Sequence, residues 1–202
     1  MPISTSFSLN HLKNKGVGAF FRPNQLPELG LTPDQLRTLV RRGLVERVAR
    51  GLYRHTEADV TEHYSLAAVS ARIPESIICL LSALSVHEIG TQLPSKVWLA
   101  VPHKSEPPRL PEFQHQLIRF AKTAWELDIE PTSFEGVPAR ITSPARTVLD
   151  CFRFERIIGR EVALEALHDS LRQKKVRVDD LYRLMNALPN KLLRAALETM
   201  AP

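Results

Sequence analysis

The chain has 202 residues, of which 44% are hydrophobic and 24% are charged, a composition typical of soluble globular proteins. It has no run of about 18 apolar residues, and its start lacks a charged segment followed by an apolar core, so we expect no transmembrane helix and no signal peptide. Cys79 and Cys151 lie far apart in apolar stretches. They indicate two buried free thiols in a cytoplasmic protein, with a disulfide as the less favoured alternative.

The positive charge is concentrated at the N-terminus. Residues 1–58 contain nine Lys and Arg residues and four Asp and Glu residues, a net charge of +5. Residues 59–202 contain 18 basic and 18 acidic residues, so the net charge of this larger part is zero. A local basic excess is typical of a surface that binds a polyanion such as nucleic acid. A solvated basic surface without a partner is the alternative.

The first elements along the chain are two short helices. Residues 4–15 predict a helix whose core contacts would be Phe7, Leu9 and Leu12. Residues 22–29 predict a second helix that ends at Gly30, with Leu26 and Leu29 pointing inward.

Residues 32–43 predict a third helix, and the rest of the N-terminal part is organised around it. Thr32 is a suitable N-cap, Pro33 suits the first helical position, and Gln35 completes a capping box. Gly43 ends the helix. One face is apolar, formed by Leu36, Leu39 and Val40. The opposite face carries Asp34, Thr38 and Arg41, flanked by Arg37 and Arg42.

A β-hairpin is predicted directly after this helix. Residues 44–48 alternate like a strand, residues 49–51 form a turn with Arg50 in it, and residues 52–54 return as a second strand. A capped basic helix followed by a hairpin with an arginine at its turn is the layout of a winged helix-turn-helix, which predicts a DNA-binding domain at residues 1–58. We expect Thr38 and Arg41 to read bases, and the alternative is that Arg41 contacts phosphate alone. Arg37 and Arg42 would be shared between bases and phosphates, and Arg50 would contact the DNA backbone or the minor groove. The candidate DNA-contacting residues are Thr32, Gln35, Arg37, Thr38, Arg41, Arg42, Arg47, Arg50 and Arg54.

Residues 59–202 predict a second, α+β domain in which helices surround a small β-sheet. Arg146 and Asp150 have the spacing of an ion pair on one helix, either structural or part of a functional surface. The predicted helices are 62–73, 76–89, 143–154, 160–174 and two shorter ones separated by Pro189. The predicted strands are 96–101, 116–120, 125–129 and 139–141, with a proline-rich loop at 103–112 and a turn at 134–137.

The sequence does not predict an enzyme. A nuclease would need a Glu-x-Lys pair to hold a metal ion, and the chain has none. His87-Glu88 lacks the second histidine of a zinc-protease motif, and there is no Cys-x-x-Cys pair. We therefore expect no catalytic residues, no metal ligands and no cofactor.

Three stretches of the chain resemble the AbiEi family of antitoxins, the antitoxin half of type IV toxin–antitoxin systems. They are RVARGLYR in the predicted hairpin, SALSVHEIG followed by VWLAVP, and ITSPARTVLDCFR followed by EVALEALHDSLRQKK. This resemblance implies a repressor whose N-terminal domain binds operator repeats upstream of its own operon. It also implies a C-terminal domain that counters a nucleotidyltransferase toxin encoded next door, without a stable complex between the two proteins.

A second interpretation remains open at this point. The chain would then be a transcriptional regulator whose C-terminal domain binds a ligand or partner protein and has no role against a toxin. A nucleotidyltransferase gene beside this one would favour the antitoxin.

Overall fold

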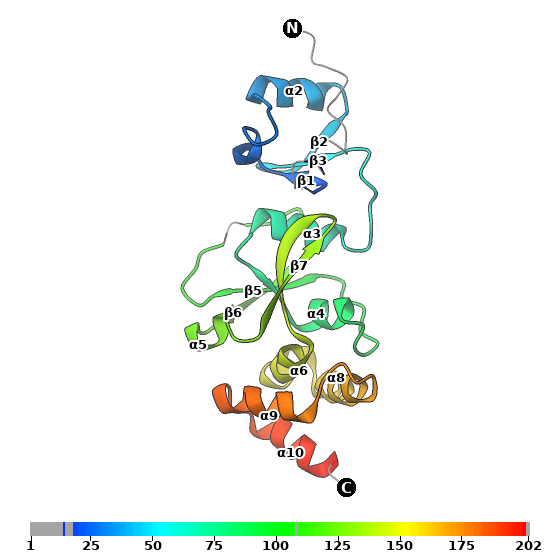
Figure 1. Ribbon diagram of the computed structural model, residues 1–202, viewed down its shortest axis with the longest axis vertical. Coiled ribbons are helices and arrows are strands. Elements are labelled where there is room, and N and C mark those ends of the chain that lie inside the picture. The colour runs from blue at the N-terminus through cyan, green and yellow to red at the C-terminus, as the bar shows by residue number, and fades with distance from the viewer. Residues whose placement is uncertain (1–13, 15–17, 108, 201–202) are drawn as a thin grey trace. The chain divides into compact units, whose positions relative to one another are not determined.

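The computed structural model describes residues 14, 18–107 and 109–200. Most of the helix predicted at residues 4–15 lies outside this range. The chain divides into two compact units. The first comprises residues 1–75 with 107–113 and 131–139, and the second comprises residues 76–106, 114–130 and 140–202. Helices and strands occur throughout the described residues, which confirms the predicted α+β class (Figure 1).

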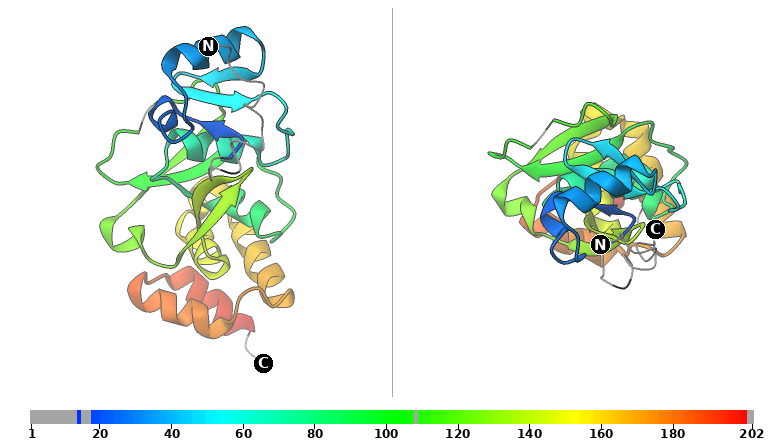
Figure 2. Two further views of the ribbon diagram at one scale, coloured as in Figure 1. Left: turned by 45° about the horizontal axis from the view of Figure 1, so that its top comes forward. Right: turned by 90° about the horizontal axis from the view of Figure 1, so that it is seen from above.

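The N-terminal module of the first unit, residues 18–58, is a small sheet covered by a helix. Its strands pair antiparallel in the order β1-β3-β2 (Figures 1 and 2). In chain order its elements are β1 (Phe20–Phe21), the 3-10 helix η1 (Pro23–Gln25), α2 (Pro33–Arg41), β2 (Val45–Ala49) and β3 (Leu52–His55). The predicted third helix and hairpin are confirmed, with ends that differ by one or two residues.

The predicted second helix is wrong in its extent. Only Pro23–Gln25 is helical, and residues 26–30 continue as hydrogen-bonded turns. Pro27 lacks the N–H that would donate to Pro23 in an α-helix, so a helix cannot run through these residues without a break. Leu26 and Leu29 are nevertheless buried, as predicted.

The first unit continues into helix α3 (Tyr64–Arg72), which the sequence predicts. Arg22 donates hydrogen bonds from Nε to the Ala71 carbonyl and from Nη2 to the Arg72 carbonyl. The last carbonyls of a helix have no partner within the helix, so Arg22 stabilises the C-terminal end of α3.

A five-stranded sheet in the order β6-β5-β4-β8-β7 follows. Strand β4 pairs antiparallel with β5 and parallel with β8, and β5 pairs parallel with β6. The strands are β4 (Ile77–Ile78), β5 (Val97–Pro102), β6 (His115–Phe120), β7 (Ile129–Phe134) and β8 (Val137–Thr142). The predicted strands near residues 96–101, 116–120 and 139–141 and the turn at 134–137 are thus confirmed.

Two predictions for this region are wrong. The predicted helix 76–89 begins as strand β4, and only α4 (Leu80–Val86) is helical. Residues 125–129 do not form a strand, because α5 (Lys122–Trp125) ends there and β7 begins at Ile129.

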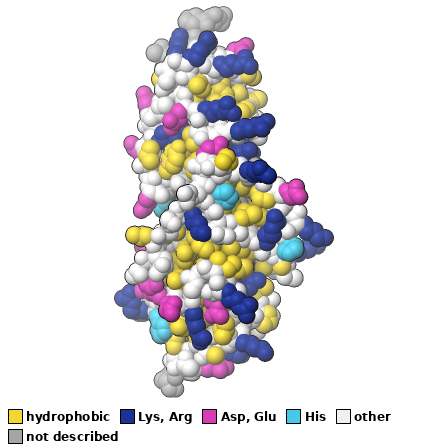
Figure 3. All heavy atoms as spheres, turned by 180° about the vertical axis from the view of Figure 1, so that it is seen from behind, with side chains coloured by type: hydrophobic (Ala, Val, Ile, Leu, Met, Phe, Trp, Pro, Cys, Tyr) yellow, Lys and Arg dark blue, Asp and Glu magenta, His cyan; other side chains and the backbone are white. Residues whose placement is uncertain are grey.

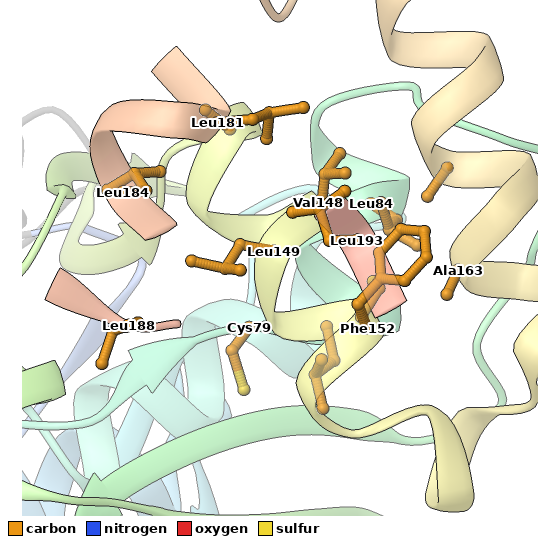
Figure 4. Close-up of a cluster of buried hydrophobic side chains, with 14 of the residues drawn as sticks. Cys79, Leu84, Val148, Leu149, Phe152, Ala163, Leu181, Leu184, Leu188 and Leu193 are labelled. Carbon is orange, nitrogen blue, oxygen red and sulfur yellow. The ribbon is translucent and has the colours of Figure 1, made fainter. Parts of the chain in front are cut away.

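The C-terminal helices of the second unit pack around α6 (Pro144–Arg153). Val148, Leu149 and Phe152 of α6 meet side chains from α4 and from the three long helices that follow (Figure 4). The remaining helices are α7 (Glu155–Ile158), α8 (Arg160–Arg172), α9 (Val178–Ala187) and α10 (Lys191–Met200).

The ion pair predicted between Arg146 and Asp150 is structural. Arg146 Nε lies 2.9 Å from Asp150 Oδ2, and neither side chain is exposed to solvent. Arg146 also donates to the carbonyls of Ala124 and Leu127, and Arg153 donates to Asp150. The alternative placement of this pair on a functional surface is therefore wrong, because the core of the second unit encloses both groups.

Candidate nucleic-acid interface

Helix α2 is held by its apolar face. Leu36 and Leu39 are buried in a cluster with Phe21, Leu29 and Val45, so the helix packs on the sheet of its own module. Residues three and four apart share a helix face, and the opposite face of α2 is therefore directed to solvent.

The N-terminal end of α2 is closed by the predicted capping box. Gln35 N donates to Thr32 Oγ1 at 3.2 Å, and Thr32 N donates to Gln35 Oε1 at 2.8 Å. These two candidate contact residues therefore fix where the helix begins. The Thr32 hydroxyl hydrogen and the Gln35 side-chain NH2 are not used in these two bonds, so both side chains keep donors for a ligand.

The exposed face of α2 carries two polar pairs. Arg37 Nη1 donates to Asp34 Oδ1 at 2.6 Å, and Arg41 Nη2 donates to Thr38 Oγ1 at 3.2 Å. The Thr38 hydroxyl also donates to the Asp34 carbonyl at 3.0 Å. Arg42 follows as the C-cap residue and is exposed. Four of the nine candidates, namely Arg37, Thr38, Arg41 and Arg42, thus lie within about two helical turns, beside an acidic residue that is not among the candidates.

The hairpin places two more arginines at the surface. Arg50 and Gly51 form the turn between β2 and β3, and Gly51 has a φ of +72°, which a glycine adopts without strain. The Arg50 side chain is exposed, as is that of Arg47, whose Nε donates to the Ala49 carbonyl at 3.4 Å. Both are accessible to a ligand.

Arg54 is not placed for contact with a ligand. Only 4% of this residue is exposed, and its Nη1 lies 3.1 Å from Glu46 Oε1 on the neighbouring strand. Its Nη2 donates to the Ala58 carbonyl, and its guanidinium lies over the Tyr64 ring at 5.4 Å. This expectation is corrected, because Arg54 uses its charge to hold the end of the hairpin within the first unit.

The surface of the module carries basic side chains that can attract an anion. Figure 3 shows Lys and Arg side chains close together in the upper part of that view, where the N-terminal module is drawn. Among residues 14, 18–107 and 109–200, no group of three His, Cys, Asp or Glu side chains is arranged to hold a metal ion. In the same part of the chain, no helix is long and apolar enough to cross a membrane.

Both cysteines are free and buried, as predicted. Burial raises the pKa of the Cys79 thiol well above its ordinary value and also raises that of Cys151, and the charge of Asp150 adds to both shifts. Thiols held in the protonated form are poor nucleophiles, so these residues belong to the core and not to a reactive site.

Comparisons with known proteins agree with the regulator interpretation for the N-terminal module. No curated protein matches the sequence. Among solved structures, that of the RV2827C protein from Mycobacterium tuberculosis is similar, with a TM-score of 0.55 and 17% sequence identity over 88% of this chain and 69% of that chain. This likeness shows a shared fold alone. Residues 17–55 match the family model described as "Transcriptional regulator, AbiEi antitoxin", which confirms the predicted family resemblance for the segment that contains α2 and the hairpin.

Proposed function

We propose that this protein is a transcriptional regulator that binds double-stranded DNA through a winged helix-turn-helix at residues 1–58. The observation that carries the proposal is the exposed arginine surface of α2 and the β2–β3 turn, within the segment that matches the AbiEi regulators. A helix presented to the major groove reads base edges, and arginines beside it neutralise phosphates.

In this proposal the contact residues divide by position. Thr38 and Arg41 lie on the exposed face of α2 and contact bases, while Arg37 and Arg42 flank them and are shared between bases and phosphates. Arg47 and Arg50 lie on the hairpin and contact the phosphate backbone or the minor groove. Arg54 is left out because it is buried.

We further propose that the regulator acts in the cytoplasm as the antitoxin of a type IV toxin–antitoxin system. It would repress its own operon, and residues 59–202 would counter a nucleotidyltransferase toxin without a stable complex. The support for this finer role is the sequence resemblance of the SALSVHEIG and ITSPARTVLD stretches, together with the family match. Co-expression tests this role. The neighbouring gene product alone should stop growth, and the full chain expressed with it should restore growth.

An electrophoretic shift tests DNA binding directly. The full chain is titrated into a duplex from the region upstream of its own gene and into an unrelated duplex of equal length and base composition. We expect the upstream duplex to bind at least about 1,000-fold more tightly, the lower end of the usual ratio for specific sites. Equal binding to both duplexes at physiological salt would contradict an operator-specific repressor.

A further inference from the structure

An acidic side chain stands on the surface that the proposed function directs toward DNA. The Asp34 side chain is 87% exposed, and its Oδ1 lies 2.6 Å from Arg37 Nη1. Phosphates repel a carboxylate, so an exposed Asp on a DNA-binding helix opposes general affinity for DNA. The Asp34 carboxylate favours DNA binding only where a base of the DNA can donate a hydrogen bond to it.

The place of Asp34 in the helix brings it close to bases. It is the second residue of α2, in the first turn after the Thr32 cap. In helix-turn-helix proteins the N-terminal residues of the recognition helix contact base edges in the major groove. The Asp34 backbone carbonyl accepts the Thr38 hydroxyl, so the backbone of this turn is tied to the next polar residue on the same face.

Asp34 and Arg37 present their polar atoms in a defined order. The carboxylate supplies an acceptor, and the guanidinium beside it supplies donors on two neighbouring nitrogens. The major-groove edge of a C·G pair has the complementary order, with the N4 donor of cytosine beside the O6 and N7 acceptors of guanine. An A·T pair does not match, because its adenine N6 donor lies between two acceptors and the thymine methyl group follows.

We propose that Asp34 and Arg37 read one C·G base pair as a unit, with Asp34 accepting from cytosine N4 and Arg37 donating to guanine O6 and N7. This inference rests on the proposed function and adds a specificity-determining residue, Asp34, together with one base pair of the target. Asp34 also orients the Arg37 guanidinium before DNA binds, because the two side chains are already in contact.

A selection from a randomised duplex library tests the proposal with the full chain. Wild type is compared with Asp34→Ala and with Glu57→Ala, which removes the same charge from an exposed residue outside α2 and the hairpin. The selected sites are then varied one base pair at a time. We expect a C·G preference at one position that falls roughly 10-fold in Asp34→Ala and is unchanged in Glu57→Ala, as for loss of one base contact.

A modified base provides a second test. It uses only the wild-type protein, so misfolding of a variant cannot affect the result. Replacing the guanine of that pair by 7-deazaguanine removes the N7 acceptor, and we expect wild type to bind this duplex roughly 10-fold more weakly. Binding with an unchanged base preference in Asp34→Ala, or full affinity for the 7-deazaguanine duplex, overturns the inference and leaves the proposed function intact. No binding of wild type to any duplex overturns both.

Discussion

At the scale of single residues, two arginines of the same hairpin have opposite environments. Arg50 is exposed at the turn, whereas Arg54 is buried and bound to Glu46, which is its cross-strand neighbour in the β2–β3 register. The motif RVARGLYR predicts the hairpin but does not separate the two arginines, because their burial depends on which other residues pack over them. The burial of Arg54 depends on Ala58 and Tyr64, which lie outside the hairpin and whose contacts cannot be read from the motif.

Replacement of each arginine should therefore have a different consequence. Arg50→Ala removes one phosphate contact, so we expect similar weakening on operator and random DNA and a decrease of about 1 in the slope of log affinity against log salt. Arg54→Ala removes a buried side chain and leaves the Ala58 carbonyl without its donor, so we expect a lower unfolding temperature. Fluorescence titrations at several salt concentrations and thermal unfolding of both variants measure these effects. A loss for Arg50→Ala on the operator alone would mean that Arg50 reads bases.

At the scale of elements, α2 was predictable and the short strand β4 was not. The capping box and the Leu36, Leu39 and Val40 spacing are local signals, and both predict the helix that the structure contains. Ile77–Ile78 is a two-residue strand inside an apolar run, and periodicity alone cannot distinguish such a strand from a buried helix. Its strand character comes from pairing with β5 and β8, whose residues are distant in the sequence.

Two carboxylates of α8 hold the segment that follows α4. Glu165 Oε1 accepts from Thr91 Oγ1 at 2.7 Å and from Thr91 N at 3.0 Å, and Asp169 Oδ2 accepts from Gly90 N at 2.7 Å. The Thr91 hydroxyl is the main cause of the lowered pKa of Glu165, and the Gly90 amide is the main cause of the lowered pKa of Asp169. Both shifts favour the charged carboxylate in the folded state.

These shifts make the stability of the second unit depend on pH. Because both folded-state pKa values are lowered, the stabilisation is complete above the unfolded-state values of about 4 and is lost as the pH falls through the lowered values. We expect the unfolding temperature to fall as the pH decreases below about 5, and to fall less in Glu165→Gln. Glu161→Gln, an exposed residue of the same helix, is the control. An identical pH profile for wild type and Glu165→Gln would contradict the assignment.

At the scale of the whole molecule, chain order does not determine which residues form a compact unit. The boundary after residue 58 stays a prediction, based on the polar link and the charge division. The first unit extends to residue 75 and includes residues 131–139. Thr61 donates from its N and its Oγ1 to Glu135 Oε1, at 3.1 and 2.9 Å. Thr61 and Glu135 are 74 residues apart, and a contact over this separation leaves no local sequence pattern. The sequence therefore could not show that residues 131–139 belong to the first unit.

The position of the charge, and not its total, should determine DNA binding. Arg37, Arg41 and Arg42 lie on or directly after α2, while Arg156, Arg160 and Lys174 are exposed in the second unit. Changing either set of three to Gln lowers the formal net charge from +5 to +2. We expect the first triple variant to bind the operator much more weakly. The slope of log affinity against log salt should fall by about 1 to 2, because Arg37 and Arg42 share phosphate contacts and each such contact contributes about 0.9. The second should bind as wild type does, since its charges lie outside the proposed interface. Salt-dependent titrations of wild type and the two triple variants on one duplex measure these effects. Equal weakening of both variants would show that DNA binding depends on net charge and not on the α2 surface.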